Sequence, residues 1–576
     1  MEKVAIIAAF SSVKGNCLGK YVIIHWKLLI GRRWAMNVQS EKRSKRIWEG
    51  AFVLTIAGLI TKILSAGYRI PYQNIAGDIG FYIYQQAYPI YGIVLVFSTY
   101  GFPVIISKLL AEKLEQDDEA SVLKILYITL FTLLGMGILL FSFLYWGAEV
   151  VAGWMGDKNL TPLIKVISFS FLLLPFISVF RGYFQGHKNM IPTAVSQVTE
   201  QSIRVVTILF MSFLLLDYGY GAYVAGAGAI FGSITGGFAA ISVLLFYLLK
   251  RKKTHQMRPF SKVSIKTIEI IKILFTQGMT ICISALLLIL FQLVDSFTVY
   301  SLLISGGIEE EAAKQAKGIY DRGQPLLQLG TVVATSLALS LVPLIASAKA
   351  RKDIAFIEAK VDLTFRLSIV VGIGAAVGLA CVLEPTNIML FRNDLGTNIL
   401  MIIGLSILFT TLSQSITAIL QGLGHPFLPA IVVIIGMLVK WIFNLLLIPG
   451  YGTVGAAVAT FVAFGIISVL HMAIVKRKLP GALQNWTFLY RVLFAMMAMG
   501  LVIFGYRWSL HKLFPIVGES RMFASFEALS SVFIGGLTYL FFIIRGSVFS
   551  EEELTEVPIG SKGTFLIRLI KGGERA

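Results

Sequence analysis

Long apolar segments recur along the whole chain, and they constrain its fold more than any other feature. A bilayer core about 30 Å thick needs about 20 apolar residues for each crossing helix. Fourteen segments meet that length, at approximately 51–70, 81–109, 125–146, 163–180, 192–216, 221–249, 273–301, 318–346, 366–384, 398–420, 429–448, 453–475, 490–508 and 524–544. The sequence therefore predicts an all-α polytopic membrane protein with about fourteen transmembrane helices.

The composition excludes a water-soluble enzyme. Only 14% of the 576 residues are charged and 56% are hydrophobic, whereas about 25% of a soluble domain is charged. The three cysteines and six histidines are scattered, so neither a disulfide framework nor a metal site is expected. The chain also lacks nucleotide-binding and hydrolase motifs. We therefore expect no metal, no cofactor and no enzymatic activity.

The net charge of +19 reports on orientation in the membrane. With the N-terminus inside, the basic runs at 42–46, 250–253 and 476–478 fall in inner loops, and only eight Lys or Arg fall in outer loops. Cytoplasmic loops carry such an excess of positive charge. We expect a cell-membrane protein with both termini in the cytoplasm, whose basic loops face anionic membrane lipids and not nucleic acid.

The chain also repeats itself. Tyr84, Gln185 and Arg204 recur 236 residues later as Tyr320, Gln421 and Lys440. The period equals six helices, so two pseudo-symmetric six-helix lobes followed by two C-terminal helices are predicted, an arrangement typical of alternating-access transporters. The expected parts are an N-lobe (36–249), a basic cytoplasmic linker (250–272), a C-lobe (273–475), helices 13 and 14 (476–545) and an amphipathic cytoplasmic tail (546–576).

Residues 1–35 do not fit this plan. Their apolar stretch is too short to span a membrane, and no cleavage site of a signal peptide follows it. Met36 precedes a polar basic stretch and then the first helix. We expect residues 1–35 to be an extension and translation to start at Met36.

Three basic residues lie near the middle of predicted helices: Lys62, Arg204 and Lys440. An ionisable residue at that depth needs a partner or a wet cavity. Glu200 lies one helical turn before Arg204, so these two residues form either a structural pair or part of a site. Lys62 and Lys440 have no acid nearby in their own helices. A wet cationic cavity explains them better than snorkelling to the membrane surface.

A second group of charges lies toward the predicted outer face. Arg69 ends helix 1, Asp295 ends helix 7, and Asp321 and Arg322 open helix 8. These residues either serve a ligand and neighbouring helices or act as caps at the membrane interface. Together with Lys62, Glu200, Arg204 and Lys440 they form the predicted substrate-binding set.

Small residues mark one helix face. Gly228, Gly232 and Gly236 are spaced four apart, which favours close packing against a neighbouring helix.

Several motifs resemble a known group of transporters. Phe180–Gly186, followed by Met190–Gln197, resembles the helix 4–5 signature of the stage V sporulation protein B branch. That branch belongs to the multidrug/oligosaccharidyl-lipid/polysaccharide exporter superfamily. Gly318–Pro325 is similar to the helix 8 entry of the same group and of MurJ-type lipid II flippases. The resemblance covers about residues 45–545.

This resemblance implies a V-shaped bundle of fourteen helices that moves undecaprenyl-pyrophosphate-linked sugars between leaflets. It implies cavity cations at Arg322 and Lys62, with Arg69 close to a third. A further arginine of the MurJ-type pattern falls near 97–100, where this chain has no charge. That departure counts against lipid II itself and leaves an anionic lipid-linked glycan as the expected substrate.

The sequence thus favours a monomeric flippase that works by alternating access, with a coupling cation or the membrane potential as driving force. Three alternatives remain. A cation-coupled multidrug antiporter would need an acidic cavity. A membrane glycosyltransferase would need acids on its outer loops, where Glu309–Glu311 is the only run. A scaffold for division or sporulation would need neither.

Overall fold

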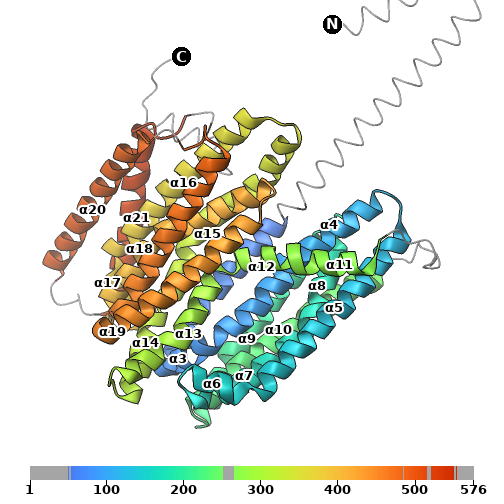
Figure 1. The fold of residues 1–576 in the computed structure, drawn as a ribbon. Helices are drawn as coiled ribbons and strands as arrows, with labels where there is room; N and C mark the ends of the chain where they lie inside the picture. The colour runs from blue at the N-terminus through green and yellow to red at the C-terminus, as the bar shows by residue number, and fades with distance from the viewer. Residues whose placement is uncertain are drawn as a thin grey trace, which may run out of the picture. The chain divides into compact units, whose positions relative to one another are not determined.

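The computed structural model describes residues 50, 53–250, 265–483, 486–514, 520–550 and 553. All elements discussed below belong to one compact unit that begins at Thr55. The predicted extension 1–35 lies outside the described residues, as do most of the linker 250–272 and of the tail 546–576. In the described part of the chain every regular element is a helix, which confirms the predicted all-α fold (Figure 1).

The N-half, residues 53–250, begins with a helix over 53–67. Its other elements are α3 (Arg69–Val96), η1 (Phe97–Gly101), α4 (Phe102–Leu114), α5 (Glu119–Trp146), α6 (Ala148–Trp154), η2 (Lys158–Leu160), α7 (Thr161–Ser168), α8 (Ser170–Gly186), α9 (Ile191–Asp217) and α10 (Ala222–Lys250).

The C-half, residues 265–478, is built from the next ten elements. They are α11 (Thr267–Ile273), η4 (Leu274–Gly278), α12 (Met279–Ala285), α13 (Leu287–Ser305), α14 (Glu310–Asp321), α15 (Gly323–Ala350), α16 (Ile354–Cys381), α17 (Leu383–Phe391), α18 (Thr397–Gly422) and α19 (Phe427–Lys478). Two further helices, α20 (Phe488–Leu513) and α21 (Arg521–Arg545), follow and pack on α16 and α17 (Figure 1).

Twelve helical stretches in the described residues are long and apolar enough to cross a membrane. Two of them, Val53–Leu114 with 62 residues and Phe427–Lys478 with 52 residues, far exceed the ~20 residues of one crossing. Each is broken at a glycine with positive φ, at Gly77 (φ +67°) and at Gly452 (φ +56°), a conformation that other residues rarely adopt. The protein is a multi-span membrane protein, and the count of fourteen stays a prediction.

Polar side chains close the first turns of several long helices. Asp118 accepts a hydrogen bond from the Ser121 amide at the start of α5, and Asp353 accepts one from Phe356 at the start of α16. Ser520 does the same for Phe523 in α21. These caps satisfy amide groups that would otherwise lack a partner, so the loop residues fix where the helices begin.

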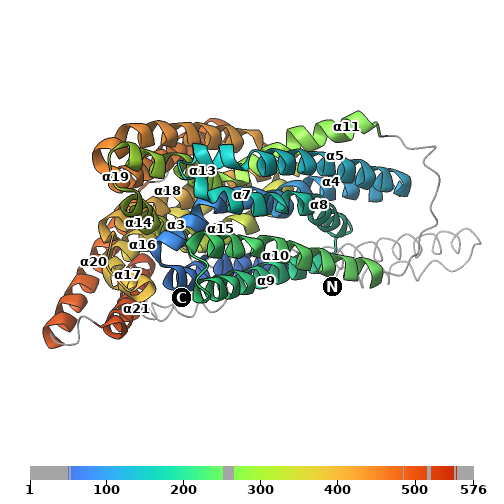
Figure 2. The same ribbon diagram turned by 90° about the horizontal axis from the view of Figure 1, so that it is seen from below.

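Helices α9 and α10 run side by side along their length (Figures 1 and 2). A Cβ atom on Gly232 would lie 2.9 Å from the Arg204 carbonyl oxygen, and one on Gly236 would lie 2.7 Å from that of Glu200. Both distances are too short for a real contact, so only glycine permits this approach. The glycine stripe is therefore a packing surface, as predicted, and it fixes the backbone that carries Glu200 and Arg204.

This close approach predicts that Gly→Ala substitutions along the glycine stripe destabilise the protein by different amounts. Gly236→Ala should destabilise the protein by about 1–3 kcal/mol, because the added methyl meets backbone and forces the helices apart. Gly228→Ala is the matched control, since its methyl would meet side-chain atoms and no backbone, with the movable end of Leu215 the nearest. Thermal unfolding in detergent should separate the two variants, and equal unfolding midpoints would contradict the packing argument.

Candidate functional site

A cavity of about 890 Å³ lies between helices of the two halves. The N-half lines it with residues of 53–67, α3, η1, α4 and α9, and the C-half with residues of η4, α12, α13, α15 and α18. The hydrocarbon of a membrane offers no partner for polar groups, so a polar-lined space among apolar helices is the place where a polar ligand can be held.

Four ionisable side chains with opposite signs line this cavity: Lys62, Arg69, Lys108 and Glu200. Lys62 forms no hydrogen bond or ion pair with any residue that the structure describes. Arg69 is 1% exposed, and its guanidinium carbon lies 4.4 Å from the centre of the Tyr88 ring. The Nε and Nη1 atoms of Arg69 have no hydrogen-bond partner among the described residues. Lys108 is exposed and donates to Gln277. The cavity lining therefore holds three cations without a paired acid among the described residues.

Glu200, the one carboxylate in the cavity lining, pairs with a residue that sequence reasoning missed. Its Oε2 atom lies 2.6 Å from Nη2 of Arg181 in α8, and Tyr91 donates a hydrogen bond to its Oε1 atom. Arg181 also donates to the side chains of Ser196 and Thr99. The structural pair weighed for Glu200 and Arg204 is therefore wrong: the acid points to another helix.

Arg204 is also buried, but in an aromatic cage. Its guanidinium carbon lies 4.8 Å from the Tyr91 ring centre, 5.5 Å from that of Tyr68 and 5.9 Å from that of Tyr88. None of its three side-chain nitrogens has a hydrogen-bond partner among the described residues. Arg204 does not itself line the cavity, but it shares the Tyr88 ring with Arg69, which does. Cation–π contacts thus hold two positive charges together without an anion.

Lys440, the repeat mate of Arg204, is placed differently from the prediction. It lies outside the cavity lining and forms a buried ion pair with Asp295, at 2.7 Å from Nζ to Oδ2. Thr460 accepts a second hydrogen bond from Lys440, and Asn444 and Tyr320 donate to Asp295. The expectation of a wet cationic environment for Lys440 is therefore wrong, because an acid from α13 neutralises it.

Asp321 and Arg322, two members of the predicted outer cluster, form two separate ion pairs. Asp321 pairs within α14 with Lys317, at 2.5 Å. Arg322 forms a forked pair with Asp78, with Nη2 2.7 Å from Oδ2 and Nε 3.0 Å from Oδ1. It donates further to Asn393. Arg322 therefore does not line the cavity as the resemblance implied.

The Asp78–Arg322 pair joins the two halves. Asp78 follows the break at Gly77 in α3, and Arg322 lies between α14 and α15. A Cβ atom on Gly318 would lie 2.1 Å from the Asp78 carbonyl oxygen, so the backbones touch here. We call this pair, with Gly318, the latch.

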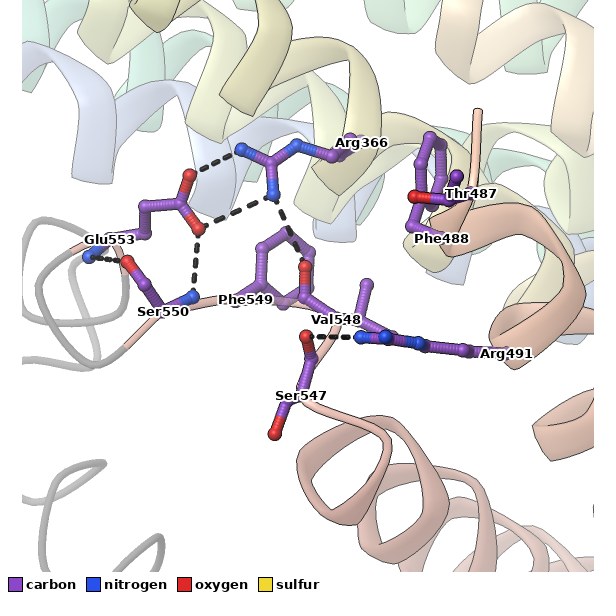
Figure 3. Close-up of a pocket in the computed structure, with 9 residues that line it drawn as sticks. All are labelled: Arg366, Thr487, Phe488, Arg491, Ser547, Val548, Phe549, Ser550 and Glu553. Atoms are coloured by element: carbon purple, nitrogen blue, oxygen red, sulfur yellow. Dashed lines mark hydrogen bonds and ion pairs between the residues drawn. The ribbon is translucent and has the colours of Figure 1, made fainter. Parts of the chain in front are cut away.

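A second pocket of about 340 Å³ lies where α16 and α20 meet the chain after α21 (Figure 3). Glu553 pairs with Arg366, while Arg491 donates to backbone carbonyl oxygens, among them that of Ser547. Partial burial acts to raise the pKa of Glu553, but the hydrogen bonds from Arg366 and Ser550 and the charge of Arg366 together hold that pKa below its usual value. The start of the tail docks here, and the charged side chains of the pocket already have hydrogen-bond partners within the protein.

The buried pair at Lys440 predicts a loss of stability that a second substitution restores. Lys440→Met leaves the Asp295 carboxylate buried without its cation, which typically costs about 3–5 kcal/mol. The double variant Lys440→Met with Asp295→Leu removes both charges and should unfold at a higher temperature than the single variant. Thermal unfolding of the purified variants tests this, and additive losses would show that the two groups do not interact.

Membrane-length helices arranged around a shared polar cavity define a multi-span membrane transporter. Residues 47–349 match the polysaccharide biosynthesis protein family, and the chain belongs to that family. It is 45% identical over 523 residues to the uncharacterized membrane protein YabM of Bacillus subtilis (strain 168). The alignment covers 90% of this chain and 96% of that protein.

Two further relatives from the same organism carry names that describe a role. The lipid II flippase MurJ is 28% identical, over 86% of this chain and 95% of the relative. Stage V sporulation protein B is also 28% identical, over 89% and 97%. The resemblance read from Phe180–Gly186 and Gly318–Pro325 is therefore confirmed, and the chain groups with transporters and not with enzymes.

Solved structures share the fold. The lipid II flippase MurJ in an inward closed conformation aligns with a TM-score of 0.63, at 17% identity, over 87% of this chain and 100% of that one. An inward-facing multidrug resistance MATE family transporter of the MOP superfamily aligns with a TM-score of 0.57, at 14% identity, over 74% and 94%. These likenesses place the chain in the fold of that superfamily.

Proposed function

We propose that this protein is a flippase for a lipid-linked anionic glycan, an undecaprenyl-pyrophosphate-linked oligosaccharide or peptidoglycan precursor. The observation that carries this proposal is the cavity lined by cations without a paired acid, of which Lys62 and Arg69 are not exposed. The family match and the relative named as a lipid II flippase support the same substrate class.

The chemistry of the cavity suits such a substrate. A pyrophosphate cannot enter hydrocarbon bare, because an isolated charge there costs several kcal/mol or more. Lys62 and Arg69 supply counter-charges, while Arg204 adds a third positive charge behind the Tyr88 ring. The isoprenoid tail stays in lipid throughout. No covalent bond changes, so the activity is transport.

We infer that the substrate moves from the inner to the outer leaflet by alternating access. Gly424 and Pro426 of the cavity lining lie in the short connection between α18 and α19, which the charge pattern assigns to the cytoplasm. The latch joins the halves near the opposite helix ends. An inside-negative membrane potential also favours outward movement of an anion, by about 2.3 kcal/mol per charge per 100 mV.

The same proposal includes the cellular setting. The protein acts as a monomer in the cell membrane with both termini in the cytoplasm, in envelope or spore-wall biosynthesis. A coupling cation or the membrane potential drives the cycle.

A cation-coupled multidrug antiporter is the alternative, because MATE transporters share the fold. A cationic drug would need an accessible acid. Glu200 is the only carboxylate in the cavity lining, and Arg181 already neutralises it. The remaining charge of the cavity is positive, which disfavours a cationic cargo.

The flippase proposal predicts a charge-specific loss of transport. Lys62→Ala and Arg69→Ala should each slow flipping of a fluorescent undecaprenyl-pyrophosphate-linked sugar in proteoliposomes by at least tenfold, because each removes a counter-charge for the pyrophosphate. Lys165→Ala is the matched control, since this exposed lysine lies in α7 outside the cavity lining. Unchanged flipping in both cavity variants, or efflux of cationic drugs without lipid movement, would contradict the proposal.

The latch predicts a change in access to the space between the halves. Arg322→Asp should expose a cysteine introduced at Ser296, a buried α13 residue whose carbonyl oxygen accepts from Gln86 of α3. The charge swap Asp78→Arg with Arg322→Asp should protect it again, because the ion pair is restored. Labelling with a membrane-impermeant maleimide, in a chain without native cysteines, measures this.

Lys317→Met is the control for that experiment. It breaks an ion pair inside α14 and not between the halves, so labelling should stay low. If Arg322→Asp labels no faster than this control, the latch does not hold the halves together.

A further inference from the structure

The two walls of the cavity differ in chemistry. Among the described residues, the N-half contributes all four charged residues that line it and two glutamines. The described C-half lining has no charged side chain but six glutamines, namely Gln277, Gln292, Gln324, Gln328, Gln414 and Gln421. A lining with charge on one wall and most of its amides on the other presents two subsites to a single ligand.

Three amides of the C-half wall, on the neighbouring helices α13 and α15, retain free hydrogen-bonding capacity. Gln292 of α13 donates its Nε2 to Oε1 of Gln324 in α15, at 3.0 Å. This contact uses one donor of Gln292. The side-chain Oε1 atom of Gln292 and the Nε2 group of Gln324 stay available to a ligand. Gln328, one turn along α15 from Gln324, has no side-chain partner among the described residues. The wall thus offers both donors and acceptors.

Hydroxyl and acetamido groups of sugars also donate and accept, so amide side chains match them. A carboxylate is different, because it needs a cation or several donors when it leaves water. Among the described residues the C-half wall contributes no cation of its own. The positive side chains of the lining, Lys62, Arg69 and Lys108, all belong to the N-half, and of these Lys108 reaches across to donate to Gln277. Lys62 and Arg69 would serve the pyrophosphate.

We propose that the C-half wall is the glycan subsite and selects uncharged sugars, while the N-half wall binds the pyrophosphate. This inference rests on the proposed flippase function. It narrows the anionic substrate to a polyprenyl pyrophosphate that carries an uncharged glycan, so that the pyrophosphate alone supplies the negative charge. A peptide-bearing head group with several carboxylates is excluded from this wall. The volume of about 890 Å³ lies near the top of the ~300–1,000 Å³ range of small-ligand pockets, which suits a short glycan.

Binding to the purified full-length protein in detergent, measured by native mass spectrometry, tests this assignment with three probes. They are undecaprenyl pyrophosphate without sugar, the same lipid carrying two N-acetylglucosamine residues, and the same lipid carrying N-acetylglucosamine and glucuronic acid. The double variant Gln292→Leu with Gln328→Leu should weaken binding of the neutral glycolipid at least tenfold. Binding of the sugarless lipid should change less than twofold.

Two further variants guard against misfolding. Gln315→Leu, on an exposed position of α14, is the matched control and should bind all three probes like the wild type. Gln328→Lys places a cation in the C-half wall. It should raise the affinity for the acidic glycolipid relative to the neutral one by tenfold or more, a gain that a damaged fold cannot produce.

The binding results test the glycan subsite and the flippase function separately. Equal weakening of sugarless and neutral lipids in the double variant, or a wild type that binds the acidic glycolipid as tightly as the neutral one, overturns the glycan subsite. In that case the flippase function stands if binding of the sugarless lipid still depends on Lys62 and Arg69. If no undecaprenyl lipid binds the wild type at all, the proposed function itself fails.

Discussion

The cost of placing charge in hydrocarbon is the constraint on which this structure depends. Each ionised group away from water needs a partner of opposite sign or a wet site. The chain meets this demand by long-range pairs between helices, of Arg181 with Glu200 and of Asp295 with Lys440. Among the charges of the cavity wall, Lys62, Arg69 and Lys108 have no acid as partner in the described part of the chain. Cations without an acid partner mark a binding site, whereas paired charges stabilise the fold.

The internal repeat makes the contrast sharper. Lys440 and Arg204 occupy equivalent positions, yet Lys440 has Asp295 as partner and Arg204 has only tyrosine rings. The residue 236 positions before Asp295 is Leu59, so the N-half lacks the equivalent acid. One half is therefore locally neutral and the other carries uncompensated positive charge. Under the proposed function, an anionic ligand would supply the missing charge in the N-half, whereas the glutamines of the C-half would bind uncharged groups.

Local pattern predicted the helices, the glycine contact of Gly232 and Gly236, and the exposure of Lys62 to a cavity. It could not predict the partners of buried charges, because these lie far apart in the chain and approach only through tertiary packing. Arg181 was missed because it lies one residue past the predicted end of its helix. Asp78 was missed because it follows Gly77 in a predicted loop, although an acid so near a helix break was a usable signal.

The position of Arg322 links closure to binding. The Nε–Nη2 edge of the Arg322 guanidinium donates to the Asp78 carboxylate of the other half. Parting of the halves at the latch would leave both charges without their partner, at a cost of several kcal/mol. A substrate anion could offset that cost only by moving from Lys62 and Arg69 to Arg322, which lies outside the cavity lining. Under the proposed function, coupling between transport and opening would follow from that transfer.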